Sequence, residues 1–373
     1  MSDTHTATEL KHVPLRHVHE ALNAKMVPFA GYLMPVRYTS DLDEHHCVRQ
    51  RVGIFDVSHM GEFRVAGPQA LDLVQWVTTN DAAKLQPGQA QYSVLTRPDG
   101  TAVDDLLVYC LSATEYLLVV NASNIDKDFT WISGQNRQKG FEATLTDESA
   151  DWCLFAVQGP KAQVVLQTLT ETNLNEIPYY QFRLGAMAGV AGTILSATGY
   201  TGAGGFEVYV PAAQAEHVWN AILVAGQGEG IQPIGLGARD TLRLEMGYAL
   251  YGHELDDNTT PLEAGLGWVT KLTKADFCGK QALEAQKAEG LAKKLTGFVV
   301  EGRGGIPRAG YEIVDATGQA VGVVTSGTLS PTHGVGLGMA FVQPAALAAG
   351  GLQLKVRERL FPLTPSKLPP AQA

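Results

Sequence analysis

The sequence predicts an α+β protein of mainly antiparallel sheets with helices, followed by a small β-barrel or sandwich at its C-terminal end. One observation is a partial internal repeat: a short strand, a glycine turn and a helix are expected at residues 63–74 and again at 155–166, with a looser copy at 206–219. Strands that alternate with helices at this spacing are typical of α+β or α/β units. In the first two copies a proline follows the glycine, and we expect it in the first turn of the helix. No glycine-rich phosphate loop opens these helices, which favours antiparallel sheets over a dinucleotide-binding fold.

A change of character after about residue 285 predicts the C-terminal barrel. Residues 286–294 are polar and helix-like, and short strand patterns separated by turns follow them. Several short strands at this spacing indicate a small barrel or sandwich of roughly 75 residues. The tail from Leu363 to Ala373 carries three prolines and no periodicity, so we expect it to be poorly ordered. The expected strands are 295–300, 311–314, 320–325 and 335–342.

The length of the chain, 373 residues, is too great for a single ordinary core. We expect residues 1–285 to form two interleaved α+β subdomains with boundaries near 55 and 150. We expect residues 286–373 to form a separate barrel domain with a loose tail.

The composition is that of a globular protein in the cytoplasm. The net charge is −10 and the sequence has no cluster of five lysines and arginines, which argues against a nucleic-acid partner. No run of about 18 apolar residues predicts a membrane span, and the N-terminus resembles neither a secretory signal nor a transit peptide. The four cysteines are widely spaced and are most simply reduced thiols, which predicts a cytoplasmic location.

Two adjacent carboxylates, Asp104 and Asp105, stand directly before the apolar run at 106–109. Such a run predicts a buried strand, whose side chains alternate between its two faces. If the strand begins at this pair, one aspartate points toward solvent and the other points inward. An inward carboxylate is a candidate general base or ligand anchor, because its burial is costly without a partner. The alternative is that both residues close the turn begun at 98–100.

The segment 198–207 holds four glycines between two strand-like runs. Glycine at this density allows the backbone to approach a ligand closely. Phosphate loops normally end in Gly-Lys-Ser/Thr, whereas here Tyr200 and Glu207 suit a flat heterocycle with N–H donors. The alternative is an elaborate hairpin loop.

Two arginines, Arg239 and Arg243, are four residues apart near the start of a predicted amphipathic helix at 235–248. They share a helix face and repel one another unless an acid lies nearby. That acid is either the carboxylate of a ligand or a structural partner such as Asp240 or Glu245.

Candidate metal and triad patterns are weak, and we expect no metal site. The run 45–47, His-His-Cys, lies in a helix-like segment whose consecutive residues face different directions. The stretch 252–256 lacks the second histidine of a zinc-protease helix. Asp56, Ser58 and His59 are triad residue types, but neighbours in an extended segment diverge and no Gly-x-Ser-x-Gly elbow is present.

Seven motifs occur in order over residues 12 to 365 and together resemble the T-protein family of the glycine cleavage system. They include Gly53-Ile-Phe-Asp-Val-Ser-His-Met-Gly-Glu, Val103-Asp-Asp-Leu, Thr198-Gly-Tyr-Thr-Gly and Gly235-Leu-Gly-Ala-Arg-Asp. The others lie at 25–35, 250–256 and 325–332.

The resemblance implies a fold, a reaction and a partner. The fold is a three-domain cloverleaf around a central folate hole, ending in a small β-barrel. The reaction transfers the methylene of the aminomethyl-dihydrolipoyl arm of H protein to tetrahydrofolate, giving 5,10-methylenetetrahydrofolate and ammonia, without a metal. Lipoylated H protein is the implied partner, and tetrahydrofolate the co-substrate.

The resemblance also implies roles for single residues, by their position along the chain. Asp105 corresponds to the essential acid beside the reacting pterin nitrogen, and Glu207 and Arg239 correspond to folate-binding residues. Those that correspond to cavity-lining residues are Met60, Tyr92, Asn121, Tyr200 and Tyr248.

Two related functions compete with this reading. One is a tetrahydrofolate-dependent demethylase of a small methylated amine or sulfonium compound on the same scaffold. The other is a folate-binding iron–sulfur assembly protein, which carries a Lys-Gly-Cys-Tyr-x-Gly-Gln-Glu signature. Here residues 276–283 read Asp-Phe-Cys-Gly-Lys-Gln-Ala-Leu, so we interpret Cys278 as a small core residue.

Overall fold

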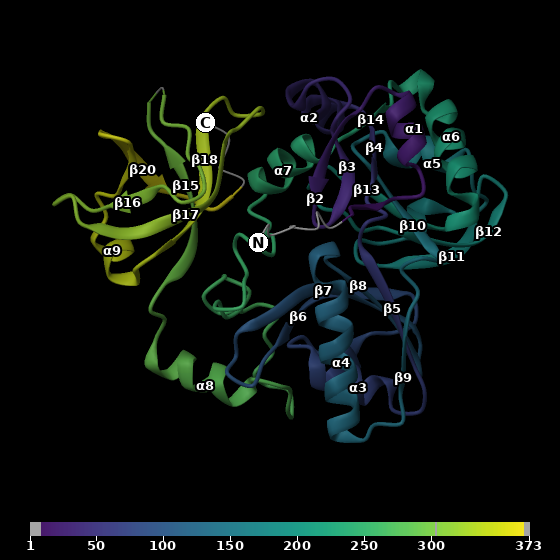
Figure 1. Cartoon of the computed structure of the whole chain (residues 1–373), viewed down its shortest axis with the longest axis horizontal. Coiled ribbons are helices and arrows are strands. Elements are labelled where there is room, and N and C mark those ends of the chain that lie inside the picture. Colours follow the sequence, from purple (N-terminus) through teal and green to yellow (C-terminus); the bar gives the residue numbers. More distant parts are fainter. Residues whose placement is uncertain (1–8, 303, 369–373) are drawn as a thin grey trace, which may run out of the picture.

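A six-stranded sheet, a five-stranded sheet and a closed barrel surround the centre of the molecule (Figure 1). The structure is a computed structural model that describes residues 9–302 and 304–368. Apart from two short parallel pairings, the paired strands are antiparallel, as predicted. No described helix has both the length and the apolar character needed to cross a membrane.

The six-stranded sheet has the order β11-β12-β13-β10-β4-β14 and is covered by helices that bury one apolar face against it. Phe155, Val208 and Trp219 lie at the centre of that core and are fully buried. The strands are β4 (Gly53–Asp56), β10 (Trp152–Gln158), β11 (Phe182–Met187), β12 (Val190–Ser196), β13 (Gly205–Pro211) and β14 (Gln232–Pro233). The helices around it are α1 (Arg16–Ala21), α2 (Asp41–Gln50), α5 (Ala162–Gln167), α6 (Ala215–Ala225) and α7 (Leu236–Glu245).

The five-stranded sheet has the order β6-β7-β8-β5-β9, with helices α3 and α4 packed on one side (Figure 1). The chain enters it after β4 and leaves it before β10, so it passes between the two sheets at residues 57–60 and 148–151. The elements are β5 (Gly61–Ala66), α3 (Ala70–Val77), β6 (Gln89–Thr96), β7 (Ala102–Ser112), β8 (Glu115–Val120), α4 (Ile125–Lys139) and β9 (Thr144–Asp147).

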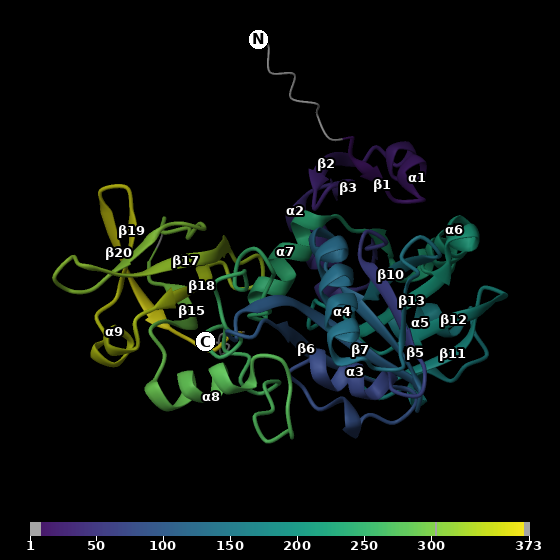
Figure 2. The same cartoon turned by 60° about the horizontal axis from the view of Figure 1, so that its bottom comes forward.

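A smaller sheet near the N-terminus has the order β1-β3-β2 and lies at the outer end of the molecule in Figure 2. Its strands are β1 (Lys11–His12), β2 (Lys25–Phe29) and β3 (Tyr32–Arg37). Single 3₁₀ turns connect other elements at Ala82–Lys84, Ala122–Asn124, Leu174–Glu176, Ala212–Gln214 and Gln227–Glu229.

The internal repeat corresponds to β5–α3 and β10–α5, and β13–α6 is its looser copy. Gly67 and Gly159 occupy the same place in the first two copies, with φ values of 133° and 123°. A Cβ at Gly159 would lie 2.5 Å from the carbonyl oxygen of Arg51, so only glycine fits there without a backbone shift. The prolines that follow these glycines lie just before the N-caps rather than in the first helical turn, which corrects that expectation by one or two residues.

The C-terminal unit is a closed barrel with the order β15-β18-β17-β16-β19-β20. Its strands are β15 (Lys294–Val300), β16 (Glu312–Val314), β17 (Ala320–Leu329), β18 (Gly336–Val342), β19 (Gln353–Val356) and β20 (Arg359–Pro365), with α9 at Pro344–Ala349. The barrel was predicted, but strands β19 and β20 were not. Leu363–Pro365 belong to β20 and pair with β15, so the expectation of a loose tail from Leu363 onward is wrong for these residues, and its last part, 369–373, lies outside the described residues.

The helix before the barrel is α8, which spans Lys280–Glu289 rather than the expected 286–294. The predicted domain boundary at 285 therefore falls inside a helix. Leu283 is fully buried, and a Cβ on Gly100 of the five-stranded unit would lie 3.1 Å from it, so α8 packs against that unit. Cys278, just before α8, is buried as predicted.

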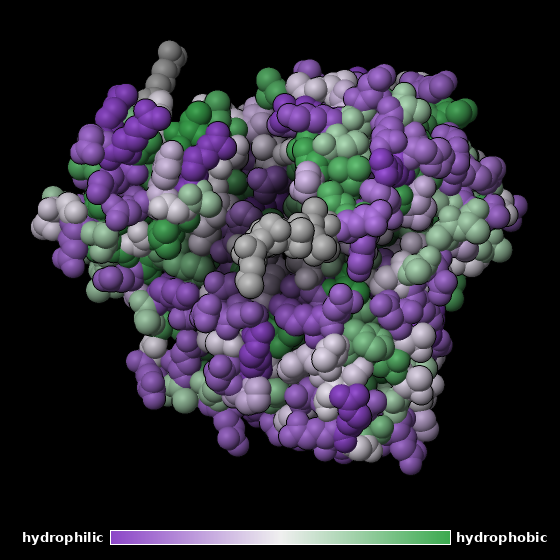
Figure 3. Space-filling view, viewed as in Figure 1, coloured by the Kyte–Doolittle hydropathy of each residue, from purple (hydrophilic) through white to green (hydrophobic). Residues whose placement is uncertain are grey.

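Helix α7 joins the barrel to the rest of the molecule through buried ion pairs. Arg243 of α7 contacts Glu254 at 2.8 Å, and Glu254 accepts a 2.6 Å hydrogen bond from Ser326 of β17. Glu245, at the end of α7, accepts a hydrogen bond from Ser330 in the loop after β17. In Figure 3 the surface between the barrel and the two sheets is hollowed.

Candidate active site

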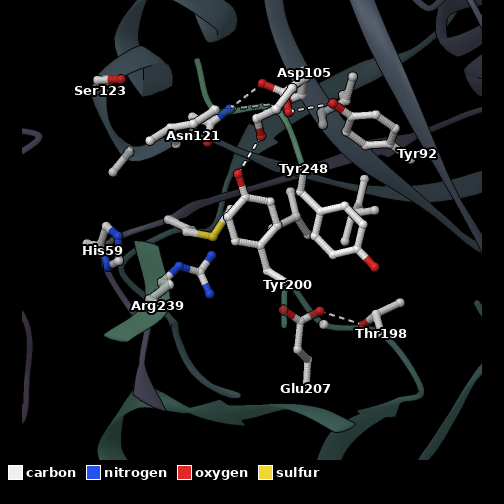
Figure 4. A pocket seen from close by; sticks show the side chains of 18 of the residues that line it. His59, Tyr92, Asp105, Asn121, Ser123, Thr198, Tyr200, Glu207, Arg239 and Tyr248 are labelled. Atoms are coloured by element: carbon white, nitrogen blue, oxygen red, sulfur yellow. Dashed lines mark hydrogen bonds between the residues drawn. The ribbon is translucent and has the colours of Figure 1, made fainter. Parts of the chain in front are cut away.

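A cavity of about 580 Å³ lies between the two larger sheets, and all eight residues predicted for the site line it (Figure 4). A volume of this size suits a ligand as large as a pterin with its side chain. Tyr92 and Asp105 come from the five-stranded sheet, Glu207 from the six-stranded sheet and Arg239 from α7. Met60, Asn121, Tyr200 and Tyr248 come from connecting segments.

Asp105 points into the cavity from β7 and is held by two donors. The Tyr92 hydroxyl donates a 2.8 Å hydrogen bond to Oδ2, and the Asn121 side-chain amide donates a 2.9 Å bond to Oδ1. Burial raises the pKa of Asp105 to about 7, the charge of Asp104 adds to this, and the hydrogen bonds from Tyr92 and Asn121 oppose it. Near neutral pH the side chain is therefore poised to take up or release a proton.

Asp104 points to the opposite face of β7, as strand alternation requires, but that face is not solvent. Its exposure is 0%, and its carboxylate accepts hydrogen bonds from the Asn121 backbone N–H and from the Asn124 side-chain amide. The expectation that one aspartate of the pair faces solvent is therefore wrong, because the end of β8 and the start of α4 cover this face. Asp104 and Asp105 also lie inside β7 and do not merely close a turn.

Glu207 lies across the cavity from Asp105 in Figure 4. Thr198 donates a hydrogen bond to one of its oxygens. Burial raises the pKa of Glu207, and the bond from Thr198 and the positive charge of Arg239 oppose that rise. The segment 198–207 connects antiparallel strands β12 and β13, so it is a hairpin loop as well as a wall of the cavity.

The two arginines of α7 have different surroundings. Arg243 is 1% exposed and forms ion pairs with Asp240 and Glu254, at 2.9 Å and 2.8 Å. Arg239 faces the cavity, where its guanidinium lies 4.8 Å from the centre of the Tyr200 ring, and its Nη1 atom has no hydrogen-bond partner among the described residues. A buried, unpartnered guanidinium N–H is costly, and an acceptor on a ligand would relieve that cost.

Aromatic rings form much of the remaining wall. The Tyr200 and Tyr248 rings lie 5.6 Å apart at an angle of 31°, and their faces offer surfaces for a flat ligand. At the rim, Trp268 is 60% exposed and stacks on Tyr92 at 6.0 Å. Tyr179, which also lines the cavity, is 66% exposed.

His59 lines the cavity but was set aside at the level of sequence. Ser58 donates a hydrogen bond to Asp56, whose other oxygen pairs with His19, and among the described residues neither Asp56 nor Ser58 hydrogen-bonds to His59. Burial and the neighbouring charge of Arg239 lower the pKa of His59 to about 4, so its imidazole is neutral at pH 7. The Gly53–Glu62 motif was a signal for this residue, since it also contains Met60.

Further cavity residues were not predicted, among them Tyr180, Thr198 and Trp268. Thr198 could have been predicted from the sequence, because it is the first residue of the glycine-rich segment. Trp268 stands in a stretch of turns without periodicity, and no sequence signal pointed to it. Within the described ranges, no group of three His, Cys, Asp or Glu side chains is arranged to hold a metal ion.

The site thus combines an acid that titrates near neutrality, a second buried acid across the cavity, and a guanidinium with a free donor. Such an arrangement can hold a flat heterocycle that carries both N–H donors and acceptors. It can also accept a proton from an amine that reacts beside Asp105.

Comparison with known proteins identifies relatives that cover nearly the whole chain. The family model described as the GCVT N-terminal domain matches residues 15–274, and that described as the glycine cleavage T-protein C-terminal barrel domain matches residues 293–371. An aminomethyltransferase from Bacteroides thetaiotaomicron is 52% identical over 342 residues, covering 91% of this chain and 94% of the relative. Another from Halothermothrix orenii is 47% identical over 361 residues, covering 96% and 99%. The crystal structure of glycine cleavage system aminomethyltransferase T from Bartonella henselae superposes with a TM-score of 0.89 at 33% identity, covering 96% of this chain and 98% of that one.

Proposed function

The chain belongs to the glycine cleavage T-protein family of aminomethyltransferases, and we propose that Asp105 is its catalytic acid–base in transfer of a methylene group from aminomethyl-dihydrolipoyl H protein to tetrahydrofolate. The products are 5,10-methylenetetrahydrofolate, ammonia and the reduced lipoyl arm. The observation that carries the proposal is the position of Asp105, half-buried in the cavity wall between two hydrogen-bond donors, with Glu207 and Arg239 across from it.

The polar groups of the cavity fit the chemistry of a reduced pterin. Glu207 offers a carboxylate to the N–H edge of such a ring, since Thr198 occupies only one of its oxygens. Arg239 offers a free Nη1 donor to a ring acceptor or a carboxylate. Met60, Tyr200 and Tyr248 supply the apolar and aromatic surface against which the ring and its substituent pack.

Asp105 holds and moves the proton of the accepting amine. Bound tetrahydrofolate supplies the nitrogen nucleophile for the incoming carbon. As a carboxylate, Asp105 accepts a hydrogen bond from that amine and takes its proton as the new carbon–nitrogen bond forms. Over the whole transfer the methylene carbon gains bonds to two folate nitrogens and loses its bonds to the amino nitrogen and to the lipoyl sulfur. The two protons that the folate nitrogens give up end on the released ammonia and on the lipoyl thiol. Tyr92 and Asn121 fix the orientation of the carboxylate. Positioned acid–base catalysis of this kind contributes about 10²–10⁴-fold in rate.

The cavity opens to the surface, which supports the proposal that lipoylated H protein delivers the aminomethyl group on its lipoyl arm. Tyr179 and Trp268 are largely exposed and line the same cavity as Asp105, so the cavity reaches the surface. A long, apolar lipoyl arm matches such an aromatic entrance. The four free cysteines, all buried, are consistent with the cytoplasmic location that we propose.

The test compares donors in one assay, the formation of methylenetetrahydrofolate. We expect turnover with aminomethyl-loaded lipoylated H protein, and none with sarcosine or dimethylglycine. Turnover with a methylated amine and none with H protein would replace the proposal with the demethylase alternative.

Substitution of Asp105 tests its role in the same assay. We expect Asp105→Asn to keep the fold and tetrahydrofolate binding but to lose about 10²–10⁴-fold in kcat, since the amide cannot take up the proton. Asp126→Asn removes an equal charge at an exposed position of α4 and serves as the matched control. Turnover by Asp105→Asn close to that of the control would remove Asp105 from the mechanism.

A further inference from the structure

A second pair of carboxyl groups lies directly behind Asp105. Asp104 accepts three N–H hydrogen bonds: from the Asn121 backbone at 3.1 Å, the Asn121 side-chain amide at 2.9 Å and the Asn124 side-chain amide at 2.7 Å. A carboxyl group that accepts three N–H bonds is stabilised in its ionised form. Burial raises the pKa of Asp104 and these bonds oppose that rise, so Asp104 is the member of the pair that carries the negative charge.

Asp128 of α4 has the opposite environment. Both of its oxygens are buried, and neither has a donor among the described residues, although the side chain lies within hydrogen-bonding reach of Asp104. Two carboxylates in this arrangement would repel each other, and neither would have a proton to offer the other. A proton on Asp128 removes the repulsion and gives it a donor toward Asp104.

The side-chain amide of Asn121 connects this pair to the cavity. Its Nδ2 atom lies 2.9 Å from Oδ1 of Asp104 and 2.9 Å from Oδ1 of Asp105. The two hydrogens of one amide nitrogen thus contact both aspartates. The orientation of this amide, and with it one of the two donors that hold Asp105, depends on the charge of Asp104.

We propose that Asp104 and Asp128 form a carboxylate–carboxylic acid pair that shares one proton and, through Asn121, positions Asp105 for proton transfer. Asp104 and Asp128 are positioning residues in this proposal, because neither reaches the cavity. The part that concerns proton transfer rests on the proposed function, whereas the shared proton does not.

Other titratable groups around the pair are few. Tyr92 of β6 donates to Asp105, and Tyr200 faces Asp105 across the cavity. On the side of α4, Lys127 contacts Tyr251 at 2.8 Å and Asp257 at 3.6 Å, and its positive charge opposes the rise in the pKa of Asp128. Burial and the charge of Asp104 raise the pKa of Asp128 well above its ordinary value, in agreement with a proton held between the two side chains.

The first test measures the shared proton without any substrate. Burial and the charge of Asp104 raise the pKa of Asp128 in the folded protein well above its ordinary value, whereas an unfolded chain releases this proton near pH 4. Unfolding thus releases one proton from this residue between pH 5 and 9, and the stability that the protonated group contributes is lost as pH rises.

Replacing Asp128 with Asn removes this titration but keeps an N–H donor toward Asp104. We therefore expect the unfolding constant of the wild type, divided by that of Asp128→Asn, to rise about tenfold per pH unit from pH 5 to 9 in urea titrations. For Asp126→Asn, the exposed control two residues earlier on α4, we expect a ratio that stays constant. A constant ratio for Asp128→Asn as well would show that Asp128 is ionised, and would overturn the proposal.

The second test measures the connection to Asp105 through the pH dependence of transfer. The charge of Asp104 raises the pKa of Asp105, so Asp104→Asn should move the acid limb of the kcat profile to lower pH, by on the order of one unit. Asp128→Leu, which offers no donor, should lower kcat, and Asp128→Asn should restore it. An unmoved limb, or equal rates for the Leu and Asn variants, would refute the positioning role. Absence of transfer by the wild type would instead refute the proposed function and leave the unfolding result intact.

Discussion

The hydroxyl of Tyr92 offers a direct way to test whether the ionised form of Asp105 is the active one. Tyr92→Phe keeps the ring that stacks on Trp268 but removes the 2.8 Å hydrogen bond to Asp105. This bond lowers the pKa of Asp105, which burial and Asp104 raise to about 7. Its loss must therefore raise the pKa further.

The magnitude follows from the strength of the bond. A hydrogen bond to a charged group contributes about 1.5–3 kcal/mol, and one pKa unit corresponds to about 1.4 kcal/mol. We expect the pKa of Asp105 to rise by about one to two units. At pH 7 the ionised fraction would fall from about one half to between about a tenth and a hundredth, and kcat would fall roughly five- to fifty-fold. The loss should be recovered at about pH 9–10, where Asp105 is ionised again.

The assay is steady-state transfer from loaded H protein between pH 6 and 10. Tyr200→Phe is the matched control, because it also removes a hydroxyl from the cavity wall, but one that donates to the Ala249 carbonyl oxygen and not to Asp105. We expect the control to leave the midpoint of the profile in place. A loss in Tyr92→Phe of the same size at every pH would show that the hydroxyl orients Asp105 or the substrate and does not set the pKa.

Two further predictions concern ligand binding and stability. Glu207→Gln should weaken tetrahydrofolate binding about 10- to 100-fold, because it removes a hydrogen bond to a charged group. Calorimetric titration under anaerobic conditions would measure the dissociation constant. A dissociation constant within twofold of the wild-type value would argue against contact between Glu207 and the ligand. Glu254→Gln leaves the buried Arg243 without its buried partner and should lower the free energy of unfolding by about 3–5 kcal/mol in urea titrations at pH 7. Asp240→Asn removes the other carboxylate partner of Arg243. Because Asp240 is 55% exposed, this change should lower the free energy of unfolding by less than about 1 kcal/mol. Equal losses of stability in the two variants would show that burial of the ion pair with Glu254 does not matter.

The fold class and half of the eight cavity residues could be predicted from the sequence because the ordered motifs contain them: Met60, Asp105, Tyr200 and Arg239. The other four lie between motifs and were assigned only through the resemblance along the whole chain: Tyr92, Asn121, Glu207 and Tyr248. The local pattern around Asp105 was sufficient to predict a buried acid on a strand. It was not sufficient to describe Asp104, because the cover over that residue comes from Asn124 and Asp128, which a hairpin and a helix bring back from about twenty residues later.

Other features could not be predicted because they also depend on contacts between residues that are far apart in the sequence. Strand β19 has only four residues, and β20 is held in place by pairing with β15, more than sixty residues earlier in the chain. The helical spacing alone also left Arg239 and Arg243 equivalent, and the resemblance assigned only Arg239 to the ligand. Only the approach of Glu254 to one of them distinguishes the structural arginine from the one in the cavity.

Helix α7, which has ten residues, connects the cavity to the C-terminal barrel. One turn carries Arg239 into the cavity, and the next carries Arg243 and Glu245 to the hydroxyl groups of the barrel. A shift of the barrel therefore moves the helix that holds the guanidinium. Substitutions in the barrel can therefore change the affinity of the cavity for its ligand, because they can change the orientation of α7 and with it the position of Arg239.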